Sequence, residues 1–256
     1  LDWLATEFMR AGWSRKAMHR LVVTSATYRQ SSKRRANLSQ VDPYNRLLGR
    51  QVRLRLEGEL VRDNALTISG LLSRKMGGPG VFPPQPNGCM NLGQHKKSWR
   101  TSKGADRFRR AVYTYRWRAT PHPALKVFDT PDAFAACTRR LRSNTPLQAL
   151  TLLNDPAYFE INVGFARRIL KEGQGSDAQQ LRFAFRLCLA REPDTAETEI
   201  LSGVLQRELT AFAKTPVDAE ALLKGQETGG FPKPKLAAWT IVARVLMNTD
   251  ETITRE

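Results

Sequence analysis

Hydrophobic residues recur every three or four positions along most of the chain, which is the pattern of amphipathic helices packed around a core. The chain opens on such a stripe, formed by Leu1, Leu4 and Phe8. Gly12 then suits the C-terminal end of a helix, and Ser14 suits the N-cap of the next one. The pattern therefore predicts a helical hairpin at the start of the chain.

A polar, basic loop is predicted over residues 29–40, and a long helix over about residues 50–72. The helix is indicated by apolar residues at helical spacing, namely Leu54, Val61, Ala65, Ile68 and Leu72. Glu57, Glu59 and Asp63 lie among several arginines in this segment. We interpret these carboxylates as partners in surface ion pairs and not as a catalytic cluster.

The last hundred residues carry the most regular helical periodicity. Helices are predicted over about residues 157–170, 181–189, 195–213 and 236–246. Asp194 and Glu197 have the spacing of a capping box at the start of the third of these helices. The Gly-, Pro- and Lys-rich residues 224–235 are expected to form an exposed loop.

Two segments interrupt the helical pattern. Residues 76–106 begin with MGGPGVFPPQPNG and predict a long loop, which Phe82 and Trp99 would pin onto the helices. Aromatic residues alternate along RFRRAVYTYRWRAT, so a small β or extended element is predicted around residues 107–118. A short helix is expected to begin at Pro131. The fold class is therefore mainly α, a multi-helix globular domain with one small extended element.

The stretch SNTPLQALTLLNDPAYF, residues 143–159, contains two helix starts. Thr145 precedes Pro146, and Asp155 precedes Pro156, which is the order of a polar N-cap followed by proline in the first turn. The first of these helices has a leucine stripe, Leu147, Leu150 and Leu153, which we expect to face the core. On that expectation Leu150→Asp would unfold or severely destabilise the domain.

Polar residues around this break form the candidate ligand site. The candidates are Arg139, Arg140, Asn144, Gln148, Asn154 and Asp155. Arginines beside amide and carboxylate groups can bind a carboxylate or sulfate in a polar notch. The alternative is that these groups tie the loop to the helix ends by hydrogen bonds, and the capping pattern favours this second interpretation.

Positive charge is concentrated in the first half of the chain. Residues 1–118 hold 24 Lys and Arg against 7 Asp and Glu, whereas residues 119–256 hold 17 of each. We expect a single domain over residues 1–256, with a possible subdivision at this change in charge. The excess predicts a polyanionic partner such as nucleic acid, a solvated basic face, or a face covered by an acidic neighbouring domain. The aromatic residues of 107–118 would either stack on nucleic-acid bases or pack on the helices, and packing is the favoured interpretation.

No catalytic or cofactor motif is present in the sequence. The cysteines, Cys89, Cys137 and Cys188, are far apart and form no C-x-x-C or C-x-x-C-H motif, so neither a zinc site nor covalent haem is supported. One disulfide is an alternative that spacing does not decide, and buried or free thiols are the favoured interpretation. His122 lies between two prolines and is expected in a turn. No apolar run approaches the roughly 18 residues that cross a bilayer. The opening within a helical pattern suggests a fragment of a longer protein.

Several long motifs together resemble a known family. They are LDWLATEF, GWSRKAMHRLVVTSATYRQSS, NRLLGRQVRLRLEGELVRDNALTISGLL, GGPGVFPPQP, RRAVYTYRWRATPHPALKVFDTPD and CTRRLRSNTPLQALTLLNDPAYFE. In this order they are similar to the planctomycete PSD-one domain, a domain of unknown function. AFRLCLAREPDTAETEI and AWTIVARVLMNTDETITRE extend the likeness over nearly the whole chain.

The resemblance implies an accessory or interaction module of a larger exported, cytochrome c-linked protein, in the periplasm or cell envelope. Its partners would be neighbouring domains of the same full-length protein, and this segment would itself carry no cofactor. An enzyme or binding domain acting on a polyanionic or sulfated polysaccharide is the alternative. Nucleic-acid binding through the basic half is a second alternative. Whether the domain is an enzyme stays open.

Overall fold

The computed structural model describes residues 1–33, 35–91 and 98–255. The chain forms two compact units. One contains residues 1–54 with the last residues from 254 onward, and the other contains residues 55–253. We call them the N-terminal unit and the helical unit. Their boundary therefore lies well before residue 118, where the excess of positive charge ends.

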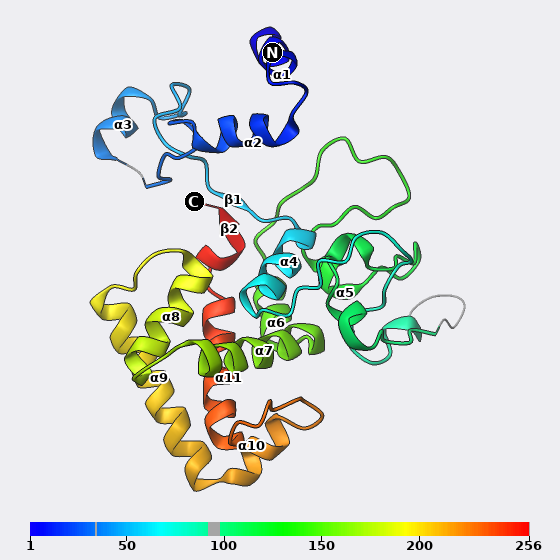
Figure 1. The fold of residues 1–256 in the computed structure, drawn as a ribbon, viewed down its shortest axis with the longest axis vertical. Helices are drawn as coiled ribbons and strands as arrows, with labels where there is room; N and C mark the ends of the chain where they lie inside the picture. Colours follow the sequence, from blue (N-terminus) through cyan, green and yellow to red (C-terminus); the bar gives the residue numbers. More distant parts are fainter. Residues whose placement is uncertain (34, 92–97, 256) are drawn as a thin grey trace. The chain divides into compact units, whose positions relative to one another are not determined.

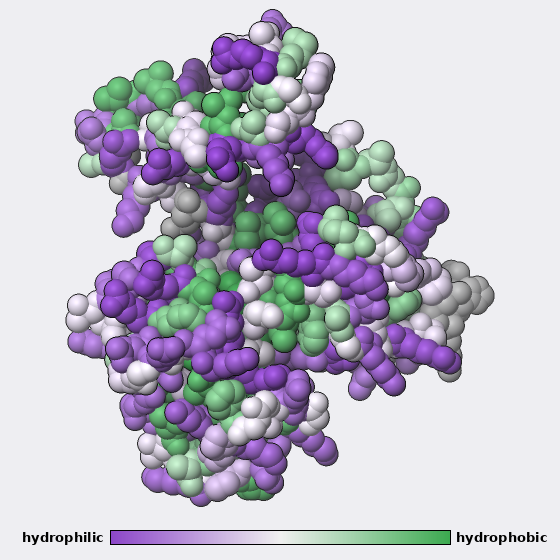
Figure 2. All heavy atoms as spheres, viewed as in Figure 1, coloured by the Kyte–Doolittle hydropathy of each residue, from purple (hydrophilic) through white to green (hydrophobic). Residues whose placement is uncertain are grey.

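The N-terminal unit begins with α1 (Asp2–Arg10) and α2 (Arg15–Thr24), as the apolar spacing predicts. Gly12 takes a left-handed φ of 64°, and the hydroxyl of Ser14 accepts a hydrogen bond from the N–H of Ala17 at 3.3 Å. Figure 2 shows hydrophobic side chains, in green, at the surface of this unit among hydrophilic ones.

A third helix belongs to the N-terminal unit, and a two-stranded sheet includes its last residue before the boundary, Leu54. The helix α3 (Ala36–Val41) lies at the end of the segment predicted to be a loop, so that prediction is wrong from residue 36 onward. Residue 34 of the same segment lies outside the described residues. The strands β1 (Leu54–Arg55) and β2 (Thr254–Arg255) pair with each other.

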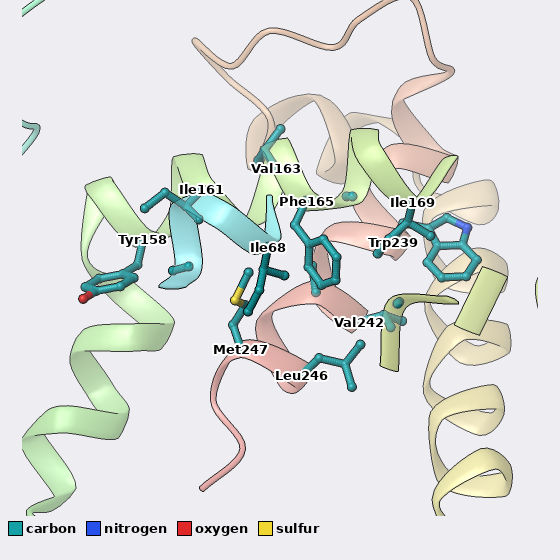
Figure 3. Packing of buried hydrophobic residues seen from close by; sticks show 14 of the residues in the cluster. Ile68, Tyr158, Ile161, Val163, Phe165, Ile169, Trp239, Val242, Leu246 and Met247 are labelled. Carbon is teal, nitrogen blue, oxygen red and sulfur yellow. The ribbon is translucent and has the colours of Figure 1, made fainter. Parts of the chain in front are cut away.

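The core of the helical unit forms around α7 and α11 (Figure 1). The helices here are α7 (Pro156–Glu172), α8 (Asp177–Leu189), α9 (Thr195–Lys214), α10 (Pro216–Leu222) and α11 (Lys233–Met247). Phe165 and Ile169 of α7 lie beside Trp239 and Val242 of α11 in Figure 3, and all four are fully or almost fully buried. The helices predicted in this region are confirmed. Here the apolar periodicity indicates the same helical segments as the structure shows.

The helix predicted over residues 50–72 is shorter in the structure, where α4 spans Gly58–Ile68. Residues before it are extended, and the N–H of Leu56 donates to the carbonyl of Ile253 at 2.8 Å. This bond to the far end of the chain replaces a helical hydrogen bond. The helix then ends at Ser69, which is followed by Gly70 with a φ of 74°.

The element predicted around residues 107–118 is extended only in part and forms no regular strand. The segment instead contains the 3-10 turns η2 (Gly104–Phe108) and η3 (Ala111–Tyr113) and two isolated bridges, Ser73 with Arg109 and Val81 with Thr114. Alternation alone cannot make a strand, because backbone groups need a partner along their length. Val81 is hydrogen-bonded to Tyr113 and Tyr115, and Ser73 is hydrogen-bonded to Phe108, so the pairing is confined to two isolated places.

The predicted loop over 76–106 is irregular in its described part, apart from η1 (Cys89–Asn91) and η2, while residues 92–97 lie outside the described residues. Phe82 and Trp99 contact each other, with ring centroids 5.0 Å apart, and Phe82 stacks on Tyr115 while Trp99 meets His122, so the rings join the loop to neighbouring segments and not to a helix face. The indole N–H of Trp99 also donates to the carbonyl of Pro83 at 2.7 Å.

Two short helices lie between this loop and the core, α5 (Pro123–Val127) and α6 (Pro146–Asn154). The helix expected at Pro131 is absent from residues 128–145, all of which are described. Asp129 adopts a left-handed φ of 57° just before it and turns the chain away from a helical path. Among the described residues, no helix is long and apolar enough to cross a membrane.

Candidate functional site

The candidate site is organised by α6, whose register differs from the prediction. Gln148 and Leu152 are its buried residues, whereas Leu147 and Leu150 are 61% and 53% exposed. The predicted inner stripe of leucines is therefore wrong. Gln148 can be buried on the inner face of α6 because its side-chain NH2 group donates hydrogen bonds to backbone carbonyls there. The expected unfolding of Leu150→Asp loses its basis, since Leu150 faces outward.

Two arginines at the N-terminal end of α6 pair with carboxylates at the start of α4. Arg140 Nη1 lies 3.0 Å from Glu57 Oε2 and 2.7 Å from Glu59 Oε2. Arg142 Nη2 lies 3.3 Å from Glu57 Oε1. Hydrogen bonding to Glu59 raises the pKa of Arg140. The predicted ion pairs of Glu57 and Glu59 are confirmed, but their partners come from more than 80 residues away in the sequence.

A second set of hydrogen bonds closes the same loop over α6. Asp129 Oδ2 accepts from both the N–H and the hydroxyl of Ser143, each at 2.7 Å. Gln148 Nε2 donates to the carbonyl of Val127 at 3.1 Å and to the carbonyl of Ser143 at 3.3 Å. We call this set of contacts, together with the ion pairs of Arg140 and Arg142, the loop clamp.

Little open volume is left inside the loop clamp. The hollow bounded by Arg55, Glu57, Asp129, Arg140, Arg142 and Gln148 with their apolar neighbours has a volume of about 10 Å³. That is about the space of one water molecule. Gln148 lines it, and its Oε1 has no hydrogen-bond partner among the described residues, so a single water that reaches this oxygen would satisfy it.

The structure separates the six predicted ligand residues into different environments. Arg140 and Gln148 meet in the loop clamp, and Asp155 lies at the opposite end of α6. The other three, Arg139, Asn144 and Asn154, are exposed. A ligand-binding role for the six residues stays a prediction, and the contacts of Arg140 and Gln148 are those of a loop tied to helix ends.

The C-terminal end of α6 meets a buried polar cluster. Asp155 caps α7, and its Oδ1 accepts from the N–H of Ala157 at 2.9 Å. The carboxylate is 5% exposed, and burial raises its pKa against the opposing effects of the cap hydrogen bonds and of the positive charge of Arg62. Tyr158 is also buried here, and burial raises the pKa of its phenol above the usual value.

Arg62, on α4, is the cation of this cluster and is only 4% exposed. Its Nη2 donates to the carbonyl of Arg107 at 3.1 Å, while its Nε has no hydrogen-bond partner among the described residues. Burial lowers the pKa of Arg62, and nearby Tyr158, Asp63, Asp155 and Glu160 oppose that effect. Several surrounding acids, and not one close ion pair, therefore offset the cost of burying this guanidinium.

His122 lies under the proline-rich loop beside this cluster. Its Nε2 is 2.9 Å from the carbonyl oxygen of Pro84, and its ring centroid is 5.6 Å from that of Trp99. Burial lowers the pKa of His122 to about 4, with a smaller contribution from the positive charge of Arg62. The residue is a buried neutral histidine, which directly precedes α5 in the chain.

The sequence did not single out this cluster because its members come from separate segments. Arg62, His122 and Tyr158 belong to no common motif and are brought together by packing. One local signal was available for Arg62, since it lies beside Val61 and one turn before Leu66 on the face of α4 that is buried. A cation on an apolar helix face indicates a buried polar partner.

The GGPG loop is organised by another buried arginine, Arg109. Its guanidinium donates to the carbonyls of Pro79, Lys75 and Gly77 and lies 3.7 Å from the centre of the Tyr113 ring. A phosphate-binding loop turns backbone N–H groups toward its ligand. Here three carbonyls turn toward a side chain instead, so the loop binds its own arginine.

The cysteines are free thiols: Cys137 is exposed, and Cys89 and Cys188 are partly buried. Burial raises the pKa of Cys89, and the negative charge of Asp155 adds to the effect. Within the described residues no group of three or more His, Cys, Asp or Glu side chains is placed to hold a metal ion. That this segment carries no cofactor stays a prediction.

The family model PSD1, described as a protein of unknown function (DUF1553), matches residues 1–205. The match covers most of the chain, so the chain belongs to this family, and the resemblance noted in its motifs is confirmed. No curated protein and no solved structure matches the chain.

Replacing Asp155 separates its capping role from its charge. We expect Asp155→Ala to lower the free energy of unfolding by about 1–2 kcal/mol, because the N–H groups of the first turn of α7 lose their acceptor. Asp155→Asn keeps a capping oxygen and should cost less, since burial already disfavours the charged carboxylate. Chemical denaturation of both variants measures the difference. A larger loss for the asparagine variant would show that the charge, and not the cap, stabilises this end of α6.

Proposed function

We propose that the chain is an accessory interaction module of a larger exported protein. Its contact surface would be the α6 leucine face, which we define as Leu147 and Leu150. The observation that carries the proposal is the inverted burial on α6, where glutamine lies inside and these two leucines lie outside. Export and the association with a larger protein rest on the family resemblance. The partner is a neighbouring domain of the same full-length protein.

The arrangement of α6 supports this assignment. Leu147 and Leu150 are three positions apart, so their side chains are neighbours on one side of the helix. Large apolar side chains that are more than half exposed gain free energy when a partner covers them, by roughly 25 cal/mol for each Å² buried. Exposed leucines beside a polar, charged rim are typical of the centre of a protein interface.

The two ends of α6 are held firmly, which suits a surface that binds without rearranging. The loop clamp holds the N-terminal end through Arg140 and Gln148. Asp155 holds the C-terminal end as the cap of α7. A surface fixed in this way loses little conformational entropy when it binds.

The two alternatives have weaker support. A polysaccharide-acting enzyme would use the polar notch, but Arg140 is paired with Glu57, and the carboxylate of Asp129 accepts from Ser143. Nucleic-acid binding would use the aromatic residues of 107–118. Tyr115, however, stacks on Phe82 with centroids 5.0 Å apart, which favours the packing role.

The α6 leucine face can be tested by Leu150→Asp with Ile200→Asp as its matched control. Ile200, on α9, is a similarly exposed aliphatic residue at 64%. We expect the free energy of unfolding of both variants to stay within about 0.5 kcal/mol of that of the parent, because both side chains face solvent. Thermal unfolding followed by circular dichroism measures this. Unfolding of Leu150→Asp alone would show that Leu150 contributes to the core and would contradict the proposal.

The contact itself requires the full-length protein. A photoreactive phenylalanine analogue placed at position 150 should crosslink to another domain of the same polypeptide, and the analogue at position 200 should not. Mass spectrometry of the crosslinked peptides identifies the partner segment. Equal crosslinking from both positions, or none from position 150, would remove the α6 leucine face as the contact.

A further inference from the structure

The two N-terminal helices, α1 and α2, are amphipathic and leave their apolar side chains in solvent. Residues 2–24 are all described, and none of those in the two helices is buried. On α1, Trp3 is 63% and Met9 is 52% exposed. On α2, Val22 and Val23 are 45% and 44% exposed. Helices this short derive most of their stability from packing an apolar face, so a partner that covers these apolar side chains would stabilise both helices.

The turn between the helices presents a further aromatic ring. Trp13 is 66% exposed and has a left-handed φ of 60°, directly after Gly12. A left-handed conformation is unfavourable for a bulky residue and persists where other contacts hold it. Here the N–H of Trp13 donates to the carbonyl of Phe8 at 2.9 Å, and the two rings meet edge to face at 5.2 Å. The turn is thus built to display an indole ring.

Cations accompany these apolar groups. Arg15, Lys16 and Arg20 of α2 are exposed. Lys16 and Arg20 lie one turn apart, away from the stripe formed by Met18, Leu21 and Val22. The N-terminal unit as a whole is basic, since residues 1–54 hold 11 Lys and Arg against 3 Asp and Glu. A basic amphipathic helix with aromatic residues is the pattern of elements that lie in the interface of an anionic membrane.

We propose that α1, α2 and the turn between them bind the surface of an anionic lipid bilayer. Trp3, Met9 and Trp13 would enter the boundary between headgroups and acyl chains, and Arg15, Lys16 and Arg20 would contact the anionic headgroups. Tryptophan favours this boundary because its ring is apolar and its N–H is polar. The apolar groups are not confined to one narrow stripe, since Trp3 and Val23 lie outside the stripes of their helices. A lipid interface accepts such a spread, whereas a groove on a protein selects a single stripe.

The test uses the whole chain and vesicles of phosphatidylcholine with or without phosphatidylglycerol. Binding is measured by co-sedimentation and by the blue shift of tryptophan fluorescence. We expect the anionic vesicles to be bound about ten- to a hundredfold more tightly, and high salt to reduce the difference, because headgroup attraction is screened. Equal binding to both vesicles, or no binding to either, would overturn the proposal.

Matched variants locate the surface. Trp13→Gly removes the indole and accepts the left-handed turn, so it should preserve the fold while weakening vesicle binding about tenfold or more. The triple change Arg15→Gln, Lys16→Gln and Arg20→Gln should abolish the preference for anionic lipid. Val217→Ala, an exposed apolar residue of α10 at 64%, is the control and should bind as the parent does.

Two further results would contradict the proposal. Circular dichroism reports whether each variant is folded, and a folded Trp13→Gly that binds anionic vesicles like the parent would overturn it. A concentration-dependent fluorescence shift without vesicles, lost in the same variant, would identify a second copy of the chain as the occupant instead. Neither result affects the test of the α6 leucine face, which uses different residues in the other unit.

Discussion

Replacing Trp239 by alanine should lower the free energy of unfolding of the helical unit by about 3–5 kcal/mol. Trp239 is fully buried on α11 and lies beside Ile169 of α7 (Figure 3). Its removal leaves a cavity between the two helices that make the most extensive packing in this unit. Packed neighbours can fill such a cavity only in part, so most of the lost contact is not recovered.

Two variants of the same helix control for this result. Trp239→Phe keeps an aromatic ring, and the indole N–H that it removes has no hydrogen-bond partner among the described residues, so its loss should be clearly smaller. Val245→Ala, at a residue 37% exposed, should change stability by less than about 1 kcal/mol. Chemical denaturation measures all three. If Trp239→Ala and Val245→Ala were equally stable, α11 could not be the centre of the core.

Lowering the pH should destabilise the helical unit through His122. The unfolded chain takes up this proton near the ordinary pKa of 6.5, whereas in the folded protein the pKa of His122 is about 4. Between these values the unfolded state binds the proton and the folded state does not. The contribution of His122 is therefore complete above about pH 6.5, and about 3 kcal/mol of it is lost as the pH falls toward 4.

His122→Gln isolates this contribution, because glutamine cannot take up a proton in this range and its amide can still donate toward Pro84. We expect the parent to lose more unfolding free energy than the variant between pH 7 and pH 4.5. The raised pKa of Asp155 acts in the opposite direction, since protonation of that carboxylate favours the folded state as the pH falls. Asp155 is common to both proteins, so the comparison cancels it. Identical pH profiles would show that the pKa of His122 is not lowered in the folded protein.

Local sequence determined the helices whose ends and faces are set by neighbouring residues. The capping box of Asp194 and Glu197 and the cap of Asp155 are present as predicted. The stripe that includes Leu181 and Phe185 packs into the core as its spacing indicates. In these elements the hydrogen-bond partners lie within four residues of each other along the chain. Periodicity and capping rules consider residues at that spacing, so they predict these helices correctly.

Such local rules predicted only some of the residues that meet at the candidate site. Arg140 and Gln148 were singled out, but their partners Glu57, Glu59 and Val127 are distant in the sequence. The buried cluster around Asp155 joins α4, the proline-rich loop and α7, and no spacing along the chain connects them.

The sequence by itself thus determined the mainly α fold, the caps at Ser14, Asp155 and Asp194, and the family, whereas Thr145 precedes α6 without a side-chain cap hydrogen bond. Tertiary structure decided where α4 begins, that residues 107–118 form no strand, and which face of α6 is buried. The reason is the same in each case. A backbone or amide group found its partner far along the chain, as Leu56 did at Ile253 and Gln148 did at Val127. Those long-range hydrogen bonds, and not the local pattern of leucines, turned Leu147 and Leu150 toward solvent.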